Sequence, residues 1–258
     1  MHTDLNAKLD HLVHRYNTKA FIANDPVQFL WHYNTPQDIE VMALLTAMNT
    51  WGRRPLIIAA LKRFETITQM QPYLFVTQRK YEEVQDSQNI YRTFFGRDLK
   101  YICRGLTAYY KDHDTLEDLF LTSTSLTPNG CPDPWKGIEN LRQLLYDSNG
   151  ATEHNHLIPN PSTSACKRLH LMLRWLVRND GIVDLGIWHR LSPALLFIPL
   201  DTHVFQVAHR IDLLQRHTPD RKAVEELTAQ LRHFDPSDPI KYDFALFGYG
   251  EEYNVSSI

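Results

Sequence analysis

The sequence predicts an all-α fold. Apolar residues recur at intervals of three and four along most of the chain, which is the period of a helix with one buried face. Several of these stretches open on a residue suited to cap a helix, with proline in the first turn. No stretch of useful length alternates between apolar and polar residues as a half-buried strand would.

The composition is that of an ordinary globular protein. The chain has 258 residues, of which 43% are hydrophobic and 22% charged, so it can bury a large core or two small, closely packed lobes. No apolar run is long enough to span a membrane. Charged residues interrupt the apolar positions of residues 1–20, so we expect that this segment is not a signal peptide. We therefore expect no membrane partner and a cytoplasmic location.

The cysteines and the net charge indicate which cofactors and partners to expect. Cys103, Cys131 and Cys166 are widely spaced and odd in number, so they predict neither a disulfide framework nor a zinc site. An iron–sulfur cluster would require four thiolates, so we expect no metal and no cofactor. The net charge of −3 argues mildly against a nucleic-acid partner, although a local basic face can still bind DNA.

The first part of the chain contains a series of predicted helices. Residues 5–16 carry apolar side chains at helical spacing. Thr35 precedes Pro36 and has Asp38 three positions later, which is typical of a helix start. Further helices are expected after Pro55, after Thr115, and over 98–110 and 134–146.

The second part begins with a loop and continues as helices. Residues 148–164 are rich in asparagine, proline and histidine, which indicates a loop or tight turn. We expect helices from Ser162 to Arg178, from Asp201 through Ile211, and over 221–233 and 239–247. The whole chain is expected to form one two-lobed helical unit, with 36–150 in one lobe and 1–35 plus 151–258 in the other.

Two segments carry candidate chemistry. Asp201 follows an apolar, proline-containing approach and opens an amphipathic helix, where a carboxylate caps free N–H groups. Lys167 follows the turn 159–162 and lies in the first turns of its helix. The positive end of a helix favours a neutral amine there, and a neutral amine is a nucleophile. In the alternative interpretation Asp201 is only a cap and Lys167 is only a solvated side chain.

Together these segments resemble the helix-hairpin-helix Gly/Pro-Asp superfamily of DNA glycosylases. The resemblance consists of the turn, the lysine-bearing helix, and the string Leu-Asp-Thr-His-Val-Phe over 200–205, which is similar to the corresponding string of endonuclease III. Residues 44–50 resemble the helix end that feeds the DNA-inserting loop, and 97–102 resemble the helix before the hairpin. The resemblance covers about 35–212 and implies a two-lobed helical glycosylase fold.

The resemblance implies roles for the two candidate residues. By position, Lys167 is the nucleophile that attacks the sugar and forms a Schiff base, and Asp201 assists by deprotonation and by stabilising the cationic sugar. The implied activity is base-excision repair by a bifunctional DNA glycosylase and abasic-site lyase. The implied partner is damaged double-stranded DNA, bound by a monomer. A base must leave the stack before such chemistry, so a wedge and a pocket are expected.

The remaining candidate residues fall into two groups. We expect DNA contacts at Met48, Asn49, Arg53, Ser164, Arg168, Arg174, Thr202 and His203, with Met48 or Asn49 as the wedge. We expect the base pocket among Trp51, Phe94, Phe95, Trp188, Asp243 and Phe247. For each aromatic residue the alternative is an ordinary place in the core.

Three departures from endonuclease III bear on the substrate. The turn 159–162 has no glycine, Lys167 and Asp201 are 34 positions apart, and the cluster cysteines are absent. The long separation is more like archaeal 8-oxoguanine glycosylases, so an oxidised purine such as 8-oxoguanine is the favoured substrate. Two other functions are compatible with the sequence: a non-catalytic DNA-binding protein of the same fold, and a helical interaction protein.

Overall fold

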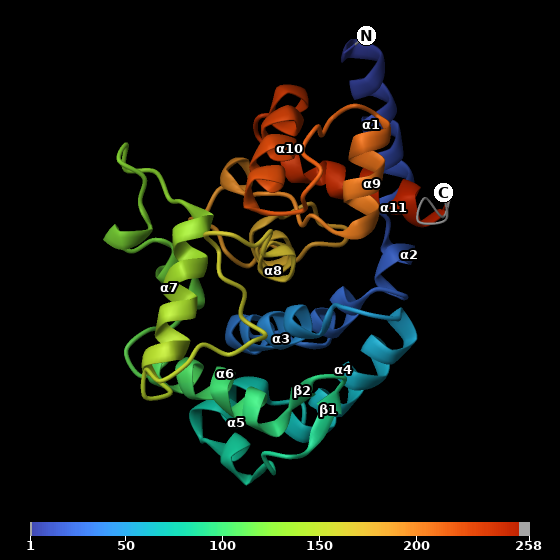
Figure 1. The fold of residues 1–258 in the computed structure, drawn as a ribbon. Helices are drawn as coiled ribbons and strands as arrows, with labels where there is room; N and C mark the ends of the chain where they lie inside the picture. Colours follow the sequence, from blue (N-terminus) through green and yellow to red (C-terminus); the bar gives the residue numbers. More distant parts are fainter. Residues whose placement is uncertain (1, 253–258) are drawn as a thin grey trace. The chain divides into compact units, whose positions relative to one another are not determined.

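The computed structural model describes residues 2–252 and is mostly helical, as the periodicity predicts (Figure 1). The chain divides into two compact units. Unit 1 combines Met1–Ala23 with Pro161–Ile258, and unit 2 is Asn24–Asn160. The boundaries therefore differ from the expected lobe 36–150, because residues 24–35 and 151–160 also belong to unit 2. Among the described residues, no helix is long and apolar enough to span a membrane.

Unit 1 is formed by both ends of the chain. Its elements are α1 (His2–Tyr16), α2 (Lys19–Ile22), α8 (Lys167–Val177), the 3-10 helix η5 (Pro193–Leu195), α9 (Thr202–Arg210), α10 (Arg221–Phe234), the 3-10 helix η6 (Pro239–Lys241) and α11 (Tyr242–Glu252). Helices α1 and α11, dark blue and red in Figure 1, lie side by side, and α11 also packs on α9. The last helix thus holds the first helix in place.

Close packing of α11 depends on glycine. A Cβ atom at Gly248 would lie 2.3 Å from the ring of Tyr16, and one at Gly250 would lie 2.8 Å from the Cβ of His203. Such distances are far below van der Waals contact, so only glycine allows α11 to approach α1 and α9 this closely. The approach brings Asp243, on the same helix, near the start of α9.

Unit 2 is built around one buried helix. Its elements are η1 (Pro26–His32), α3 (Pro36–Asn49), α4 (Arg54–Thr68), α5 (Pro72–Thr77), η2 (Lys80–Glu83), β1 (Asn89–Tyr91), β2 (Phe94–Phe95), α6 (Gly96–Tyr109), η3 (Leu116–Phe120), η4 (Ser123–Ser125) and α7 (Pro134–Asp147). Every residue of α3 from Ile39 to Asn49 is buried. The predicted cap is confirmed, because Thr35 Oγ1 accepts a hydrogen bond from the Asp38 N–H.

A buried carboxylate joins α3 to the rest of unit 2. Glu40 is fully buried, and it accepts hydrogen bonds from the Tyr110 hydroxyl at 2.8 Å, from the Leu116 N–H at 3.0 Å and from Thr115. Burial and the charge of Glu40 raise the pKa of Tyr110 well above its usual value. A buried charge is tolerated when hydrogen bonds replace its water, so Glu40 fixes η3 on α3.

Two local features differ from the sequence-based expectation. Strands β1 and β2 form an antiparallel hairpin whose turn contains Arg92 in the left-handed region, with φ 51°. Its strands are too short to show a recognisable alternation of apolar and polar residues, so the sequence did not predict them. Helix α8 begins at Lys167 instead of Ser162, so residues 148–166 form one long connection between α7 and α8.

Candidate functional site

Lys167 and Asp201 lie together in unit 1. The Lys167 Nζ is 3.6 Å from the Asp201 Oδ2. The aspartate side chain is 11% exposed and the lysine side chain 33% exposed, so the carboxylate is largely shielded from water while the amine keeps access to solvent. Residues 34 positions apart, singled out for their local sequence, thus have their charged groups in contact.

The helix start of α9 fixes the Asp201 carboxylate. Asp201 has extended backbone angles and is the N-cap of α9. Its Oδ1 accepts a hydrogen bond of 2.8 Å from the Val204 N–H, so the predicted cap is confirmed. Because Oδ1 is held by the helix, Oδ2 is left to face Lys167.

The turn before α8 fixes the origin of the Lys167 side chain. Cys166 is buried and has left-handed backbone angles, with φ 45°. Its carbonyl accepts the N–H groups of Leu169 and His170, each at 3.0 Å, and Lys167 is the first residue of α8. A cation is unfavourable at this end of a helix, and the carboxylate of Asp201 offsets that effect.

Two arginines continue the row that Lys167 begins. Arg174 and Arg178 lie seven and eleven positions after Lys167, so all three side chains leave α8 in nearly the same direction. Arg174 is 3% exposed, and it pairs with Asp184 at 3.2 Å and with Asp243 on α11. The prediction that Arg174 contacts DNA is therefore wrong for this conformation, because carboxylates of unit 1 enclose its guanidinium.

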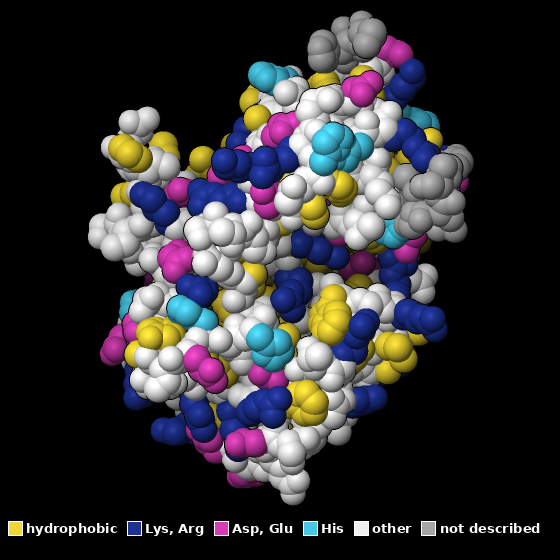
Figure 2. All heavy atoms as spheres, viewed as in Figure 1, with side chains coloured by type: hydrophobic (Ala, Val, Ile, Leu, Met, Phe, Trp, Pro, Cys, Tyr) yellow, Lys and Arg dark blue, Asp and Glu magenta, His cyan; other side chains and the backbone are white. Residues whose placement is uncertain are grey.

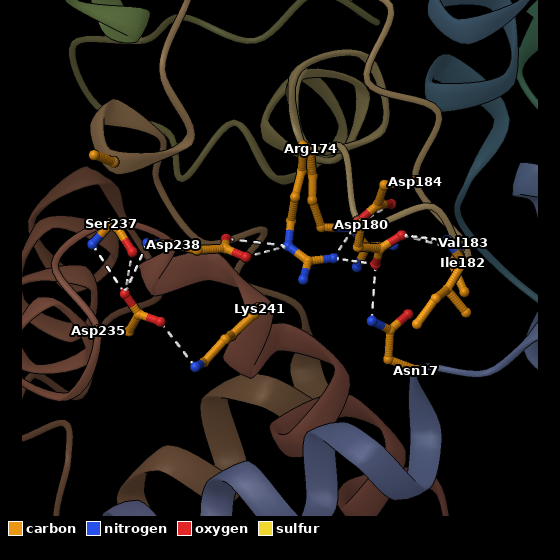
Figure 3. Close-up of polar contacts among 12 residues, drawn as sticks. Asn17, Arg174, Asp180, Ile182, Val183, Asp184, Asp235, Ser237, Asp238 and Lys241 are labelled. Atoms are coloured by element: carbon orange, nitrogen blue, oxygen red, sulfur yellow. Dashed lines mark hydrogen bonds and ion pairs between the residues drawn. The ribbon is translucent and has the colours of Figure 1, made fainter.

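Arg178 connects two loops of unit 1 to the end of α8. Its Nη1 pairs with Asp184 at 2.9 Å and with Asp180 at 2.5 Å, and its Nε pairs with Asp238 at 2.8 Å. Asp180 also accepts the side-chain amide of Asn17 at 2.8 Å. In Figure 3, Asp180 and Asp238 lie on opposite sides of the guanidinium drawn between them, and Asn17 points toward Asp180. Asn17 and Asp238, which are far apart in the sequence, are thus connected through Asp180 and Arg178.

Acid groups outnumber the two arginines in this cluster. Burial raises the pKa of Asp184, although Arg174 and Arg178 oppose that effect. Burial raises the pKa of Asp243, the charge of Arg174 opposes this effect, and the negative charge of Asp201 adds to it, so that the pKa is raised to about 6. The charge of Asp201 acts on Asp243 because α9 and α11 pack together. Asp243 therefore belongs to the surroundings of the Lys167–Asp201 pair.

The sequence profile of one protein family matches residues 25–252, and that family is described as a protein of unknown function, DUF2400. The chain belongs to the DUF2400 family. No curated protein and no solved structure matches the chain. The DUF2400 match includes Lys167, Asp201 and the whole arginine row, whereas Asn17 lies before its first residue.

The expected wedge residues of this DUF2400 member are buried in unit 2. Met48 and Asn49 have no exposed surface, and the Asn49 side-chain amide donates to the Leu45 carbonyl at 2.7 Å. A side chain enclosed in this way presents no atom for insertion into DNA. The structure thus contradicts the prediction of DNA contact at both positions in this conformation.

The loop after α3 presents a cation on an aromatic ring instead. Arg53 is exposed and Trp51 is partly exposed. The guanidinium of Arg92, from the β-hairpin turn, lies 4.0 Å from the centroid of the Trp51 ring, and the Tyr91 hydroxyl donates to the Trp51 carbonyl at 2.7 Å. Arg92 was not singled out from the sequence, because only the hairpin places it beside Trp51.

The remaining candidates for the base pocket are divided between the units. Phe94 is buried in unit 2 with its ring centroid 5.4 Å from that of Phe64, and Trp188 is 2% exposed. Neither ring is open to stack on a base in this conformation, so the core alternative holds for both. Phe95 and Phe247 are partly exposed, and Phe247 lies 5.8 Å from the ring of His203.

The other expected DNA contacts lie in unit 1 around the two helix starts. Thr202 is exposed and His203 partly exposed at the start of α9. The Ser164 hydroxyl accepts the Cys166 N–H at 3.2 Å, so that amide is not free for a phosphate. Arg168 is partly exposed, and burial lowers its pKa. Among residues 2–252, no group of three His, Cys, Asp or Glu side chains is placed to hold a metal ion.

Proposed function

We propose that this DUF2400 member is a DNA glycosylase with abasic-site lyase activity and the fold of the helix-hairpin-helix glycosylases. The observation that carries the proposal is the 3.6 Å contact between Lys167 Nζ and Asp201 Oδ2. Each residue stands at a helix start in a sequence context similar to that of the glycosylases. The proposed substrate is damaged duplex DNA with an oxidised purine such as 8-oxoguanine, acted on by a cytoplasmic monomer.

Base release requires a nucleophile and a stabilising charge. An amine attacks only when neutral, and Asp201 is close enough to accept the proton that Lys167 gives up. The Lys167 nitrogen then forms a bond to C1′ of the damaged nucleotide, and the base leaves with the electron pair of the glycosidic bond and gains a proton. A carboxylate in a partly buried position stabilises the positive charge that develops on the sugar.

Strand cleavage follows from the same bond. Opening of the sugar ring converts the aminal at C1′ into a protonated Schiff base, which makes the C2′ protons acidic. Removal of one C2′ proton lets the C3′–oxygen bond break, and the phosphate leaves with its electron pair. Water then hydrolyses the Schiff base and restores the Lys167 amine, so atoms and charges balance over the cycle.

The proposed DNA contacts do not depend on a strongly basic protein. On the face shown in Figure 2, Lys and Arg side chains are interspersed with Asp and Glu, as the net charge of −3 implies. Exposed Arg53 and Arg92 beside Trp51 in unit 2 offer phosphate contacts and an aromatic surface. Such local groups support binding through a few phosphates.

Borohydride trapping tests the proposed function. Duplex oligonucleotides with an abasic site or 8-oxoguanine are incubated with the wild type, Lys167→Ala, Asp201→Asn and the control Lys8→Ala. Lys8 is an exposed lysine of unit 1 paired with Asp4. We expect a covalent adduct with the wild type and Lys8→Ala, none with Lys167→Ala, and a reduced yield with Asp201→Asn. Absence of an adduct and of base release with folded wild type would refute the proposal.

A non-catalytic DNA-binding protein is the second candidate, and the Arg92–Trp51 stack favours it. A guanidinium held on an aromatic face presents donors toward a phosphate without any reactive group. This candidate predicts salt-dependent duplex binding by the wild type, equal binding by Lys167→Ala, and no trapped adduct with either. The same oligonucleotides in a binding titration therefore distinguish the two functions.

A further inference from the structure

The charged groups along α8 form a row of separate ion pairs. Lys167 faces Asp201 at the start of the helix, and Arg174 faces Asp184 and Asp243 two turns later. Seven residues of helix correspond to about 10 Å along the axis, which long cationic side chains can span. Two cations on one stripe therefore have access to neighbouring carboxylates.

Asp243 lies where these pairs meet. It is a buried residue of α11 that forms an ion pair with Arg174, and the negative charge of Asp201 raises its pKa. The other partner of Arg174, Asp184, is shared with Arg178 at 2.9 Å. Asp243 is therefore the carboxylate that Arg174 does not share with Arg178, and it is the one whose electrostatic neighbour is Asp201.

We propose that Asp243 is a positioning residue, which binds Arg174 and so keeps that guanidinium from competing with Lys167 for the Asp201 carboxylate. This inference rests on the proposed function for its consequence in catalysis, because Lys167 and Asp201 are the reacting groups there. The buried setting makes the competition strong, since charges attract more at low dielectric than in water. Asp243 itself touches no substrate in this scheme.

Removal of the Asp243 charge should allow Arg174 to compete with Lys167 for the Asp201 carboxylate. Asp243→Asn keeps the size and an acceptor oxygen of the side chain but removes the carboxylate charge that faces Arg174. The guanidinium, which has lost this counter-charge, then draws Asp201 away from Lys167. The catalytic amine loses its proton acceptor and its ion-pair partner, so the proposed reaction slows while the amine becomes more open to other reagents.

Four proteins test the inference: wild type, Asp243→Asn, the charge-balanced double variant Arg174→Gln with Asp243→Asn, and the control Asp238→Asn. Asp238 is also an acid partner of this row, but it pairs with Arg178, about 16 Å along α8 from Lys167. Trapping on abasic duplex gives one rate for each protein. Acetylation of Lys167 by acetic anhydride, measured by mass spectrometry relative to exposed Lys62, gives a second rate that requires no enzymatic activity.

We expect Asp243→Asn to slow trapping at least tenfold and to speed the relative acetylation of Lys167 several-fold. The double variant should recover trapping to within threefold of the wild type, because removal of the Arg174 charge removes the competitor. Asp238→Asn should match the wild type in both rates. A merely structural role predicts instead that the double variant is worse than Asp243→Asn.

The two measurements separate the inference from the proposed function. If the wild type forms no adduct, the proposed function fails, and the acetylation rates still report on Asp243. Unchanged acetylation of Lys167 in Asp243→Asn, or a double variant no faster in trapping than Asp243→Asn, would overturn the positioning role.

Discussion

Arg178 and Asp184 form an ion pair of 2.9 Å in which both side chains are buried. The same carboxylate accepts a hydrogen bond of 3.2 Å from Arg174 Nε, so Asp184 connects Arg174 of α8 with Arg178, the C-cap of that helix. Asp238 and Asp180 complete the surroundings of Arg178. Helix α8 is thus fixed by ion pairs at one end, and the same helix carries Lys167 at the other.

Arg178→Met is expected to destabilise the protein by about 3–5 kcal/mol, because loss of one partner leaves buried carboxylates without a counter-charge. The Arg178 side chain is 6% exposed, so water cannot replace the lost contacts. Urea unfolding at pH 7 measures the effect. Lys8→Met, which removes an exposed pair with Asp4, serves as the control and should leave the free energy of unfolding nearly unchanged. Equal effects of the two substitutions would show that the cluster contributes no more than a surface pair.

Asp180→Asn should destabilise the protein near neutral pH and lose this effect in acid. Burial alone would raise the pKa of Asp180, but the Ile182 N–H and the Arg178 guanidinium outweigh it and lower the pKa below the usual value. The folded state then holds the ionised form more strongly than the unfolded state does. This contribution is present above about pH 4 and is lost as the pH falls through the lower folded pKa. Urea unfolding of wild type and Asp180→Asn at pH 7 and at a series of pH values from about 4 to about 2 checks it, and a difference that stays constant over this range would contradict the prediction.

Asp243→Asn should show the opposite pH dependence. The pKa of Asp243 is raised by burial and by Asp201 to about 6, so between about pH 4 and 6 the folded state binds the proton more tightly than the unfolded state. Stability of the wild type therefore decreases as the pH rises through this window, and Asp243→Asn lacks that decrease. The stability advantage of the wild type over the variant should be larger at pH 4.5 than at pH 7. A smaller advantage at pH 4.5 would mean that Asp243 is ionised throughout the window.

The capping preferences of single residues are visible in the sequence, so most helix starts could be predicted from it. A carboxylate or hydroxyl before an apolar stripe caps a helix wherever the chain folds, so Asp201 and Thr35 were predictable. The start of α8 could not be predicted, because residues that are distant in the sequence bind the segment before it. The Thr163 carbonyl accepts the Arg221 N–H at 3.4 Å, and Ser164 pairs with Asp220 in an isolated β-bridge.

The surroundings of the candidate site depended on long-range contacts. Arg174 stands on a basic stripe that is typical of a solvated or phosphate-binding face, yet its partners come from positions 184 and 243. The sequence of the helix alone does not predict these two acidic partners. The burial of Met48 could not be predicted either. Helix α3 is buried on all sides, and its sequence does not distinguish a residue that inserts into DNA from a residue of the core. The contact of Lys167 with Asp201 likewise became visible only in three dimensions.

Gly52→Ala should destabilise unit 2 and displace Arg92. Gly52 has a φ of 103°, and a Cβ there would lie 2.4 Å from the Arg92 Nη1 and 2.7 Å from the Tyr91 hydroxyl oxygen. The backbone strain is worth about 1–3 kcal/mol, and the clash adds to it. Gly130→Ala is the matched control, because Gly130 also has a positive φ but has nothing within 4 Å of its Cβ position. Urea unfolding should show the larger loss for Gly52→Ala, and equal losses would mean that the hairpin turn moves aside freely.

Arg92→Ala and Arg53→Ala should each weaken duplex DNA binding and lower its salt dependence, whichever of the two proposed functions is correct. Each phosphate contact contributes about 0.9 to the slope of log K against log salt concentration, so each substitution should reduce that slope by about one. Fluorescence anisotropy of a labelled duplex at several salt concentrations measures both quantities. Arg79→Ala is the control, because Arg79 is an exposed arginine of unit 2 whose charge is partly balanced by Glu82. Removal of any exposed arginine lowers affinity slightly through net charge, but only a phosphate contact changes the slope by a whole unit. Equal slopes for all three variants and the wild type would exclude the Trp51 loop and the β-hairpin turn from the DNA interface.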